Sequence, residues 1–379
     1  MKQTARIIST YTGDTSGVCS ALFELGGLVV MHDPSGCNST YSTHDEPRWY
    51  DMDSLVFISG LTERDAIFGN DEKIISDTVR AAEELNPRFI AVAGTPIPYL
   101  TGCDFNFIAS EIENRCGIPT FGFETDGMKS YIHGASMAFA EYSARMCKKT
   151  EKTSEMSINI LGATPLDFSV NGTIESIKEK MEKNGIKVNS IMAMGCNYED
   201  IEDAGNAHVN LVISSCAVET AKIMKQKFGI PYVAGVPFGN QMLNWLCDLI
   251  QTKSIEESDI INFDLKTSDE IVIIGESITS LSLAKAINLE TGKRTKVISA
   301  VDTPKELLSE NCVKATYEDE ITPELQNAVN IIADPLYRPI CQNNSNFIEL
   351  PHEAFSGRIY RESIPNLIEN LDCITKKLI

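Results

Sequence analysis

The sequence predicts an α/β fold of two to three Rossmann-like domains with parallel sheets. Short apolar runs rich in valine and isoleucine alternate with segments of helical period along most of the chain, as in successive βαβ units. The chain has 379 residues, which is more than one hydrophobic core usually organises. Two polar stretches without apolar periodicity, 148–155 and 252–259, are typical of linkers. We therefore expect three α/β domains, at 1–150, 151–258 and 259–379.

Strands are expected where a short apolar run is bounded by turn residues. In the first domain these runs are 28–31, 55–59, 89–93 and 119–123. In the second they are 158–162, 187–192, 209–213 and 232–234, with a helix over 174–183. The third domain opens with a strand at 271–275, followed by a helical pattern over 281–289. Gly117 and Gly229, each followed by Ile-Pro, should end helices, because glycine accepts the left-handed cap and proline bars continuation.

The formal charge of the chain is −20, from 33 basic and 53 acidic side chains. This balance repels phosphate backbones and anionic lipid, so nucleic acid and membranes are not expected as partners. The sequence contains neither a recognisable signal peptide nor an apolar run of the ~18 residues that a spanning helix needs, so we expect a cytoplasmic protein. In that compartment the eleven cysteines are free thiols or metal ligands rather than disulfides.

Two cysteines, Cys19 and Cys37, stand in glycine-containing segments at expected helix starts. Cys19 follows a Gly/Thr/Ser stretch, and Cys37 follows a strand and a Pro-Ser-Gly turn. The positive end of a helix dipole lowers the pKa of a thiol and favours the thiolate, which is the form that binds metal. Gly17 and Gly36 would let the backbone approach a bulky ligand and donate N–H groups to it. The spacing alone leaves open a pair of loop thiols without metal, since no CxxC motif brackets them.

Residues 28–40, with the turn His-Asp-Pro-Ser-Gly-Cys at 32–37, resemble the cluster-binding turn of nitrogenase component 1 subunits. Residues 61–73 and 94–104 resemble the segments that follow this turn in the family, and the resemblance extends to about residue 240. It implies a nitrogenase component 1-like fold, an oxidoreductase activity and an iron–sulfur cluster at a subunit interface.

On this resemblance Cys19 and Cys37 match two ligands of the interface cluster. Thr95 stands where the family's third cysteine is usual, and Cys103, eight residues further on, is a candidate for that role. A threonine hydroxyl is a poor iron ligand beside a thiolate. A [4Fe-4S] cluster held by two cysteines from each of two subunits is therefore favoured over an [8Fe-7S] cluster.

The resemblance does not extend to the ligands of the nitrogenase active-site metallocluster. Cys216 lies near the position of its cysteine but out of register, and we expect a core thiol. His352 is the only histidine late enough to match its histidine ligand, and we expect it in an exposed loop. No nitrogenase-type heterometal cofactor is therefore expected.

The function implied is that of a catalytic-component subunit of a nitrogenase-like, ATP-dependent reductase acting on a small substrate. Its partners would be an iron–sulfur ATPase similar to nitrogenase reductase and an identical or different component 1-like subunit. The chain has no GxxxxGK[ST] motif and should not bind ATP through a P-loop itself. Two alternatives stay open: a non-catalytic scaffold on which a metallocluster or tetrapyrrole-like cofactor is assembled, and a metal-free α/β binding module with inert cysteines.

Overall fold

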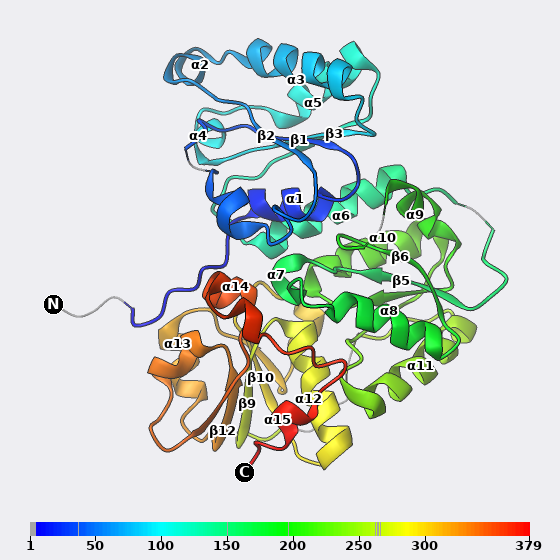
Figure 1. Ribbon diagram of the computed structural model, residues 1–379, viewed down its shortest axis with the longest axis vertical. Coiled ribbons are helices and arrows are strands. Elements are labelled where there is room, and N and C mark those ends of the chain that lie inside the picture. The colour runs from blue at the N-terminus through cyan, green and yellow to red at the C-terminus, as the bar shows by residue number, and fades with distance from the viewer. Residues whose placement is uncertain are drawn as a thin grey trace.

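The computed structural model describes residues 5–36, 38–149, 151–195, 197–261, 263, 265 and 267–379. Within these ranges the chain forms three parallel sheets, each flanked by helices (Figure 1). The α/β class and the parallel sheets are therefore confirmed. Each sheet lies inside one of the three expected domains, while the domain boundaries themselves stay a prediction.

The first sheet has the order β2-β1-β3-β4. Its alternating residues point to two separate cores: Val29 and Met31 pack with helices α1 and α6, and Leu28 and Val30 pack with α3 and α5. The sheet is thus covered on both faces, as parallel sheets require. The elements of this part are α1 (Asp14–Leu22), β1 (Leu28–Met31), η1 (Tyr41–Asp45), β2 (Leu55–Ile58), α2 (Glu63–Phe68), α3 (Asp71–Leu85), β3 (Ile90–Ala93), α4 (Pro96–Leu100), α5 (Phe105–Cys116), β4 (Thr120–Phe123) and α6 (Tyr131–Met146).

The second sheet has the order β6-β5-β7-β8. Its elements are β5 (Ser157–Leu161), α7 (Pro165–Phe168), α8 (Thr173–Lys183), β6 (Lys187–Ile191), α9 (Tyr198–Glu202), η2 (Asp203–Asn206), β7 (Val209–Val212), η3 (Ser215–Ala217), α10 (Val218–Phe228), β8 (Tyr232–Ala234) and α11 (Gly239–Glu256). The expected linker at 252–259 is wrong in its first half, because α11 continues to Glu256. Gly117 and Gly229 end α5 and α10 in the left-handed conformation, as expected.

The third sheet has the order β11-β10-β9-β12-β13. Its elements are β9 (Ile271–Gly275), α12 (Ser277–Thr291), β10 (Lys296–Ser299), η4 (Lys305–Leu307), β11 (Cys312–Lys314), α13 (Glu318–Glu324), β12 (Asn330–Ala333), η5 (Pro335–Ile340), β13 (Asn346–Glu349), α14 (Glu353–Ser356), η6 (Gly357–Ser363) and α15 (Asp372–Thr375). Helix α14 lies near the centre of Figure 1, next to α7, so the C-terminal segment returns to the middle of the molecule. None of the described helices is long and apolar enough to cross a membrane.

Helices α1 and α6 pack with their backbones in close approach. A Cβ atom built on Gly17 would lie 2.2 Å from the carbonyl oxygen of Tyr131, and one built on Gly134 would lie 1.9 Å from that of Asp14. Both distances are far below van der Waals contact, so only glycine fits at either position. Gly17 therefore serves a helix–helix contact, and the expectation that it cradles a ligand is wrong.

A buried histidine follows β1 directly. His32 is 5% exposed, its Nδ1 atom lies 2.8 Å from Ser59 Oγ, and its ring meets Phe105 edge-on. Burial, with a smaller contribution from the positive charge of Lys73, lowers the pKa of His32 to about 4. The native protein therefore holds this ring neutral under conditions in which an unfolded histidine is protonated.

Gly17→Ala should lower the free energy of unfolding by about 1–3 kcal/mol or more, because the added methyl group forces α1 and α6 apart. Gly36→Ala is the matched control: its Cβ would meet nothing closer than the Pro34 carbonyl oxygen at 3.6 Å, so a change within about 0.5 kcal/mol is expected. Urea unfolding followed by circular dichroism measures both. Equal stabilities of the two variants would contradict the packing argument.

The His32 ring should make folding stability depend on pH. Its pKa is lowered from 6.5 to about 4 in the folded state, so its contribution is complete above pH 6.5 and is lost as the pH falls toward 4. Between pH 7 and pH 5 this loss amounts to about 2 kcal/mol. Urea titrations of the wild type and of His32→Gln at both pH values isolate it. If the variant keeps the full difference, another group is responsible.

Candidate functional sites: a cysteine-bearing turn and an interdomain cavity

The turn that follows β1 is anchored at its base by buried polar groups. Asp33 is fully buried; its Oδ1 lies 2.8 Å from the hydroxyl of Thr95, and its Oδ2 accepts a hydrogen bond from the Asn38 backbone N–H. Thr95, also fully buried, thus ties the ends of β1 and β3 together. Cys37 lies outside the described residues. Its neighbour Gly36 is exposed, so the turn that carries this cysteine rises from a fixed base to the surface.

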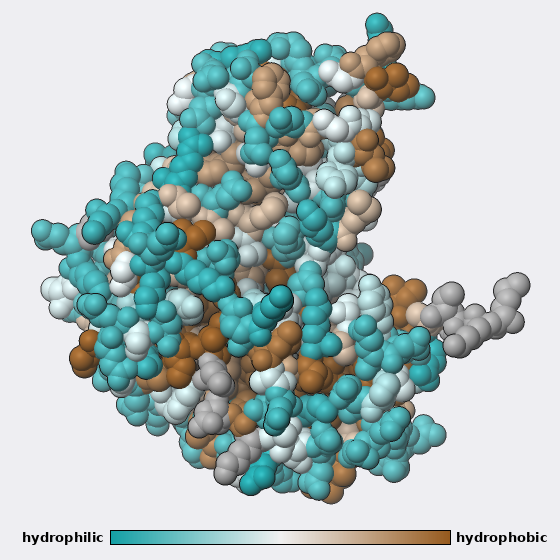
Figure 2. All heavy atoms as spheres, turned by 180° about the vertical axis from the view of Figure 1, so that it is seen from behind, coloured by the Kyte–Doolittle hydropathy of each residue, from teal (hydrophilic) through white to brown (hydrophobic). Residues whose placement is uncertain are grey.

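Exposed apolar side chains surround the elements beside this turn. They belong to β2, to α2 and α4, and to the segment after β4, and we call them the apolar rim. The space-filling view in Figure 2 shows brown side chains at its upper right, over the elements at the upper left of Figure 1. Large exposed apolar patches mark interaction surfaces. The most exposed members, with their exposed fractions, are Phe57 47%, Ile67 69%, Phe68 77%, Leu100 76% and Met128 67%.

Cys19 does not open a helix, and the expectation that its thiol faces the positive end of a helix dipole is wrong. Helix α1 begins five residues earlier at Asp14, whose carboxylate accepts the backbone N–H groups of Thr15, Asp126 and Gly127. Cys19 is fully buried, and burial, reinforced by the carboxylates of Glu46 and Asp45, raises the pKa of its thiol. Its ligand role stays a prediction.

Cys103 lies between α4 and α5 on the other face of the first sheet from Cys19. Its Sγ atom is 3.8 Å from the Asp71 carboxylate, and burial together with that charge raises the pKa of its thiol to about 12. The structure therefore does not bring Cys19 and Cys103 together. Across the part of the chain that the structure describes, no cluster of three or more histidine, cysteine or carboxylate side chains has the geometry of a metal site.

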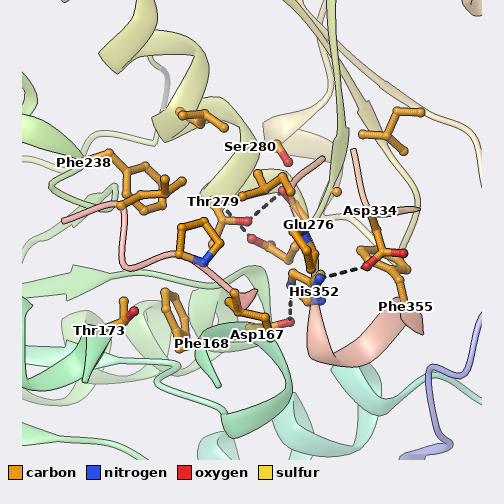
Figure 3. Close-up of a pocket in the computed structure, with 18 residues that line it drawn as sticks. Asp167, Phe168, Thr173, Phe238, Glu276, Thr279, Ser280, Asp334, His352 and Phe355 are labelled. Carbon is orange, nitrogen blue, oxygen red and sulfur yellow. Dashed lines mark hydrogen bonds and ion pairs between the residues drawn. The ribbon is translucent and has the colours of Figure 1, made fainter. Parts of the chain in front are cut away.

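A cavity of about 90 Å³ lies between the second and third sheets, with room for several water molecules. It is placed where strand order reverses, between β5 and β7 in one sheet and between β9 and β12 in the other. In open α/β sheets, ligands bind outside the carboxyl ends of the strands at such switch points. Here two switch points face one cavity. Figure 3 shows its lining, in which Asp167, Glu276, Asp334 and His352 converge from separate segments.

Asp167 comes from α7 and is buried. Its Oδ1 accepts a 2.7 Å hydrogen bond from the Tyr11 hydroxyl, and its Oδ2 accepts from the hydroxyls of Thr164 and Ser214. Burial raises the pKa of Asp167, while these three hydrogen bonds oppose the shift. Tyr11 also lines an open groove between the first and third sheets, with Ser130 and Tyr317. The Tyr11 hydroxyl thus connects a solvent-exposed groove with the wall of the cavity.

His352 lies in the lining of this cavity, and the expectation of an exposed loop residue is wrong. Its Nδ1 accepts a hydrogen bond from the Ala354 backbone N–H, which caps α14. Its Nε2 is buried without a hydrogen-bond partner and lies 4.0 Å from Asp167 Oδ1 (Figure 3). Burial lowers the pKa of His352, so the ring is neutral at neutral pH.

The other two carboxylates of the lining are fully engaged by protein donors. Glu276 caps α12, accepting from Thr279 N–H, and reaches the Ser215 N–H across the domain junction. Asp334 accepts from the backbone N–H groups of Leu336 and His352 and from the Ser356 hydroxyl. Sequence reasoning missed these residues. A usable signal existed, because Glu276 and Asp334 directly follow buried strands.

Cys216 is fully buried in η3 and does not line the cavity. Burial and the nearby Asp167 carboxylate raise the pKa of its thiol, so a neutral core thiol is the form that its surroundings favour. Among the described residues no cysteine, lysine or arginine lines the cavity.

Comparison with known proteins identifies relatives of this arrangement. The nitrogenase iron-molybdenum cofactor biosynthesis protein NifE of Clostridium pasteurianum is 26% identical over 72% of this chain and 67% of its own length. The nitrogenase molybdenum-iron protein alpha chain of the same organism is 26% identical over 54% of this chain and 40% of its own. One subunit of the light-independent protochlorophyllide reductase of Prosthecochloris aestuarii is 25% identical over 59% and 42%, respectively.

These matches span between 40% and 67% of the relatives' lengths. The fold matches a solved structure, "Nitrogenase Cp1 at pH 6.5", with a TM-score of 0.67 over 100% of this chain and 94% of the other, at 17% identity. A family model described as nitrogenase component 1 type oxidoreductase matches residues 17–272, more than half of the chain. The chain belongs to the nitrogenase component 1 type oxidoreductase family.

Proposed function

We propose that this chain is a subunit of a nitrogenase-like reductase, which holds a [4Fe-4S] cluster through Cys37 at a subunit interface and reduces a small substrate in the cavity between its second and third sheets. The observation that carries the proposal is the turn after β1. Its base is fixed by Asp33 and Thr95, its tip is exposed, and the apolar rim lies beside it. Such a surface suits a second component 1-like subunit, identical or different, and an iron–sulfur ATPase as electron donor.

The turn has features that suit a cluster. The side-chain amide nitrogen of Asn38, next to Cys37, is buried without a hydrogen-bond partner and could donate to a sulfide. Gly36 leaves open space around the backbone. Cys19 stays the candidate for a second thiolate, but it could bind iron only if the packing of α1 against η1 opened, because its sulfur is fully buried. When bound, the cluster would supply single electrons.

The residues of the cavity would supply protons. Reduction consumes protons together with electrons, and a closed cavity needs a route for them. The Asp167 carboxyl group, whose raised pKa favours the protonated form, faces the cavity beside His352. Its hydrogen bond with the Tyr11 hydroxyl offers a path for reprotonation from the open groove. Apolar walls of Phe168, Phe238 and Phe355 would keep bulk water out.

A second candidate function is that of an assembly scaffold. NifE of Clostridium pasteurianum, a cofactor biosynthesis protein by its name, matches a larger share of this chain than the nitrogenase alpha chain does, 72% against 54%. A scaffold would use the same fold to hold a cofactor and release it to an acceptor protein.

Cys37→Ala should remove the iron–sulfur absorption and the bound iron from anaerobically purified protein, because this turn carries the proposed ligand. Cys103→Ala is the matched control and should keep its iron, since Cys103 packs on the opposite face of the sheet from Cys19. Iron and sulfide counts with EPR measure both. Cys19→Ala then tests the second ligand: loss of iron would show that α1 opens when the cluster is bound. Full iron content in Cys37→Ala would overturn the proposal.

Electron transfer separates the reductase from the scaffold. The anaerobic protein is mixed with a substoichiometric amount of a nitrogenase reductase-like ATPase, ATP and dithionite, and the cluster signal is followed by EPR. A reductase subunit should be reduced only when ATP is present, with its iron retained over many ATPase turnovers. A scaffold would instead lose iron to an added acceptor protein. ATP-independent behaviour in the presence of an active ATPase would contradict the proposed reductase.

A further inference from the structure

We infer that the interdomain cavity takes an uncharged organic ligand that carries a hydrogen-bond acceptor, and that the Nε2–H group of His352 holds this acceptor. The inference deepens the proposed function, on which it rests only in taking this cavity as the substrate site. It is carried by the unpartnered nitrogen of His352, by the full engagement of the lining carboxylates and by the absence of cations from the described lining.

The hydrogen bond at Nδ1 determines which nitrogen of His352 carries the proton. A backbone N–H can only donate, so the contact from Ala354 at 3.2 Å requires a lone pair on Nδ1. In the neutral ring the proton is then on Nε2. This N–H group is buried without a partner, and the nearest acceptor, Asp167 Oδ1, is 4.0 Å away, too far for a hydrogen bond. An unmade buried donor is costly, so a ligand acceptor placed between the two groups would relieve that cost.

The lining carboxylates exclude anions without offering themselves to cations. Asp167, Glu276 and Asp334 each accept hydrogen bonds from protein donors at both oxygens. A carboxylate or phosphate ligand would meet their negative charge with no lysine or arginine in the described lining to offset it. A cationic ligand would gain no free oxygen to accept from it, and it would face the Nε2–H group of His352, which is itself a donor.

The rest of the wall is apolar and lacks thiols. Phe168, Phe238, Leu283, Leu350 and Phe355 surround the polar groups, so the body of the ligand is expected to be apolar. With no cysteine among the described lining residues, a thiolate-tethered metallocluster does not fit this cavity. The ligand class is therefore a neutral organic molecule with a carbonyl, imine or aromatic nitrogen at the His352 end.

Four probes of similar ring size test this class: pyridine, benzene, benzoate and N-methylpyridinium. The intact chain, labelled with ¹⁵N-histidine, has five histidines, and His352→Asn identifies the His352 signals by their loss. Asparagine can still cap α14 through its side-chain oxygen but does not reach as far as Nε2. His133→Asn, on α6 outside the cavity, is the matched control. Binding is followed by titration at pH 7.5, where pyridine is neutral.

Pyridine should shift the His352 Nε2 resonance and bind about tenfold more tightly than benzene, the expected gain from satisfying one buried donor. His352→Asn should abolish this difference, and His133→Asn should preserve it. Benzoate and N-methylpyridinium should bind more weakly than pyridine. Equal binding of pyridine and benzene, tighter binding of either ion, or no binding of pyridine would overturn the inference. These titrations need no cluster and no ATPase, so their result is separate from that of the Cys37 and electron-transfer experiments.

Discussion

The buried guanidinium of Arg48 is the interaction on which the relative placement of the first two sheets depends. Its five N–H donors meet five acceptors: both oxygens of Glu46, one of Glu24, and the backbone carbonyls of Ser20 and Ala193. Arg48 is only 3% exposed, so any donor left unmade would carry a large desolvation cost. Ala193 belongs to the second domain and is held at φ 93°, a left-handed conformation that an alanine rarely adopts. The strain indicates that the surroundings, Arg48 included, dictate the path of this chain segment.

The cavity between the second and third sheets depends on the two ends of the chain in a similar way. The segment before α1 runs along the junction, where the Thr10 N–H bonds to the Phe355 carbonyl and the Tyr11 hydroxyl to Asp167. From the C-terminal side, Glu353 accepts from Ser169 of the second domain while pairing with Arg361. Neither sheet closes the cavity alone. Its polar lining exists only when segments more than 150 residues apart in the sequence have come together, so contacts of large sequence separation build the site.

The limits of sequence reasoning follow from this distinction between local and distant contacts. Strands such as β1, β8 and β9 could be predicted because a buried parallel strand is a continuous apolar run, which is a local property. The start of α1 could not, since its Gly/Thr/Ser stretch resembles a loop and its glycine is explained only by α6. The position of His352 was missed for the same reason: a Leu-Pro-His segment looks like a surface loop until α14 folds against α7. The resemblance of residues 28–40 identified the family, but nothing local could show that Asp167, Glu276 and His352 share one cavity.

The two candidate sites are joined by a continuous set of contacts through the segment before α1. Helix η1 follows the cysteine-bearing turn, and its Asp45 accepts hydrogen bonds from the hydroxyls of Thr12 and Ser16 at 2.8 and 2.9 Å. The residue before Thr12 is Tyr11, which bonds to Asp167 in the cavity wall. A movement of η1, such as binding at the turn would bring, therefore acts on the same short segment that positions the hydroxyl bonded to Asp167. Because Thr12 and Tyr11 are adjacent in the chain, displacement of one cannot leave the other in place. In a reductase of this build, the delivery of electrons at the turn and of protons at the cavity would then share one mechanical element.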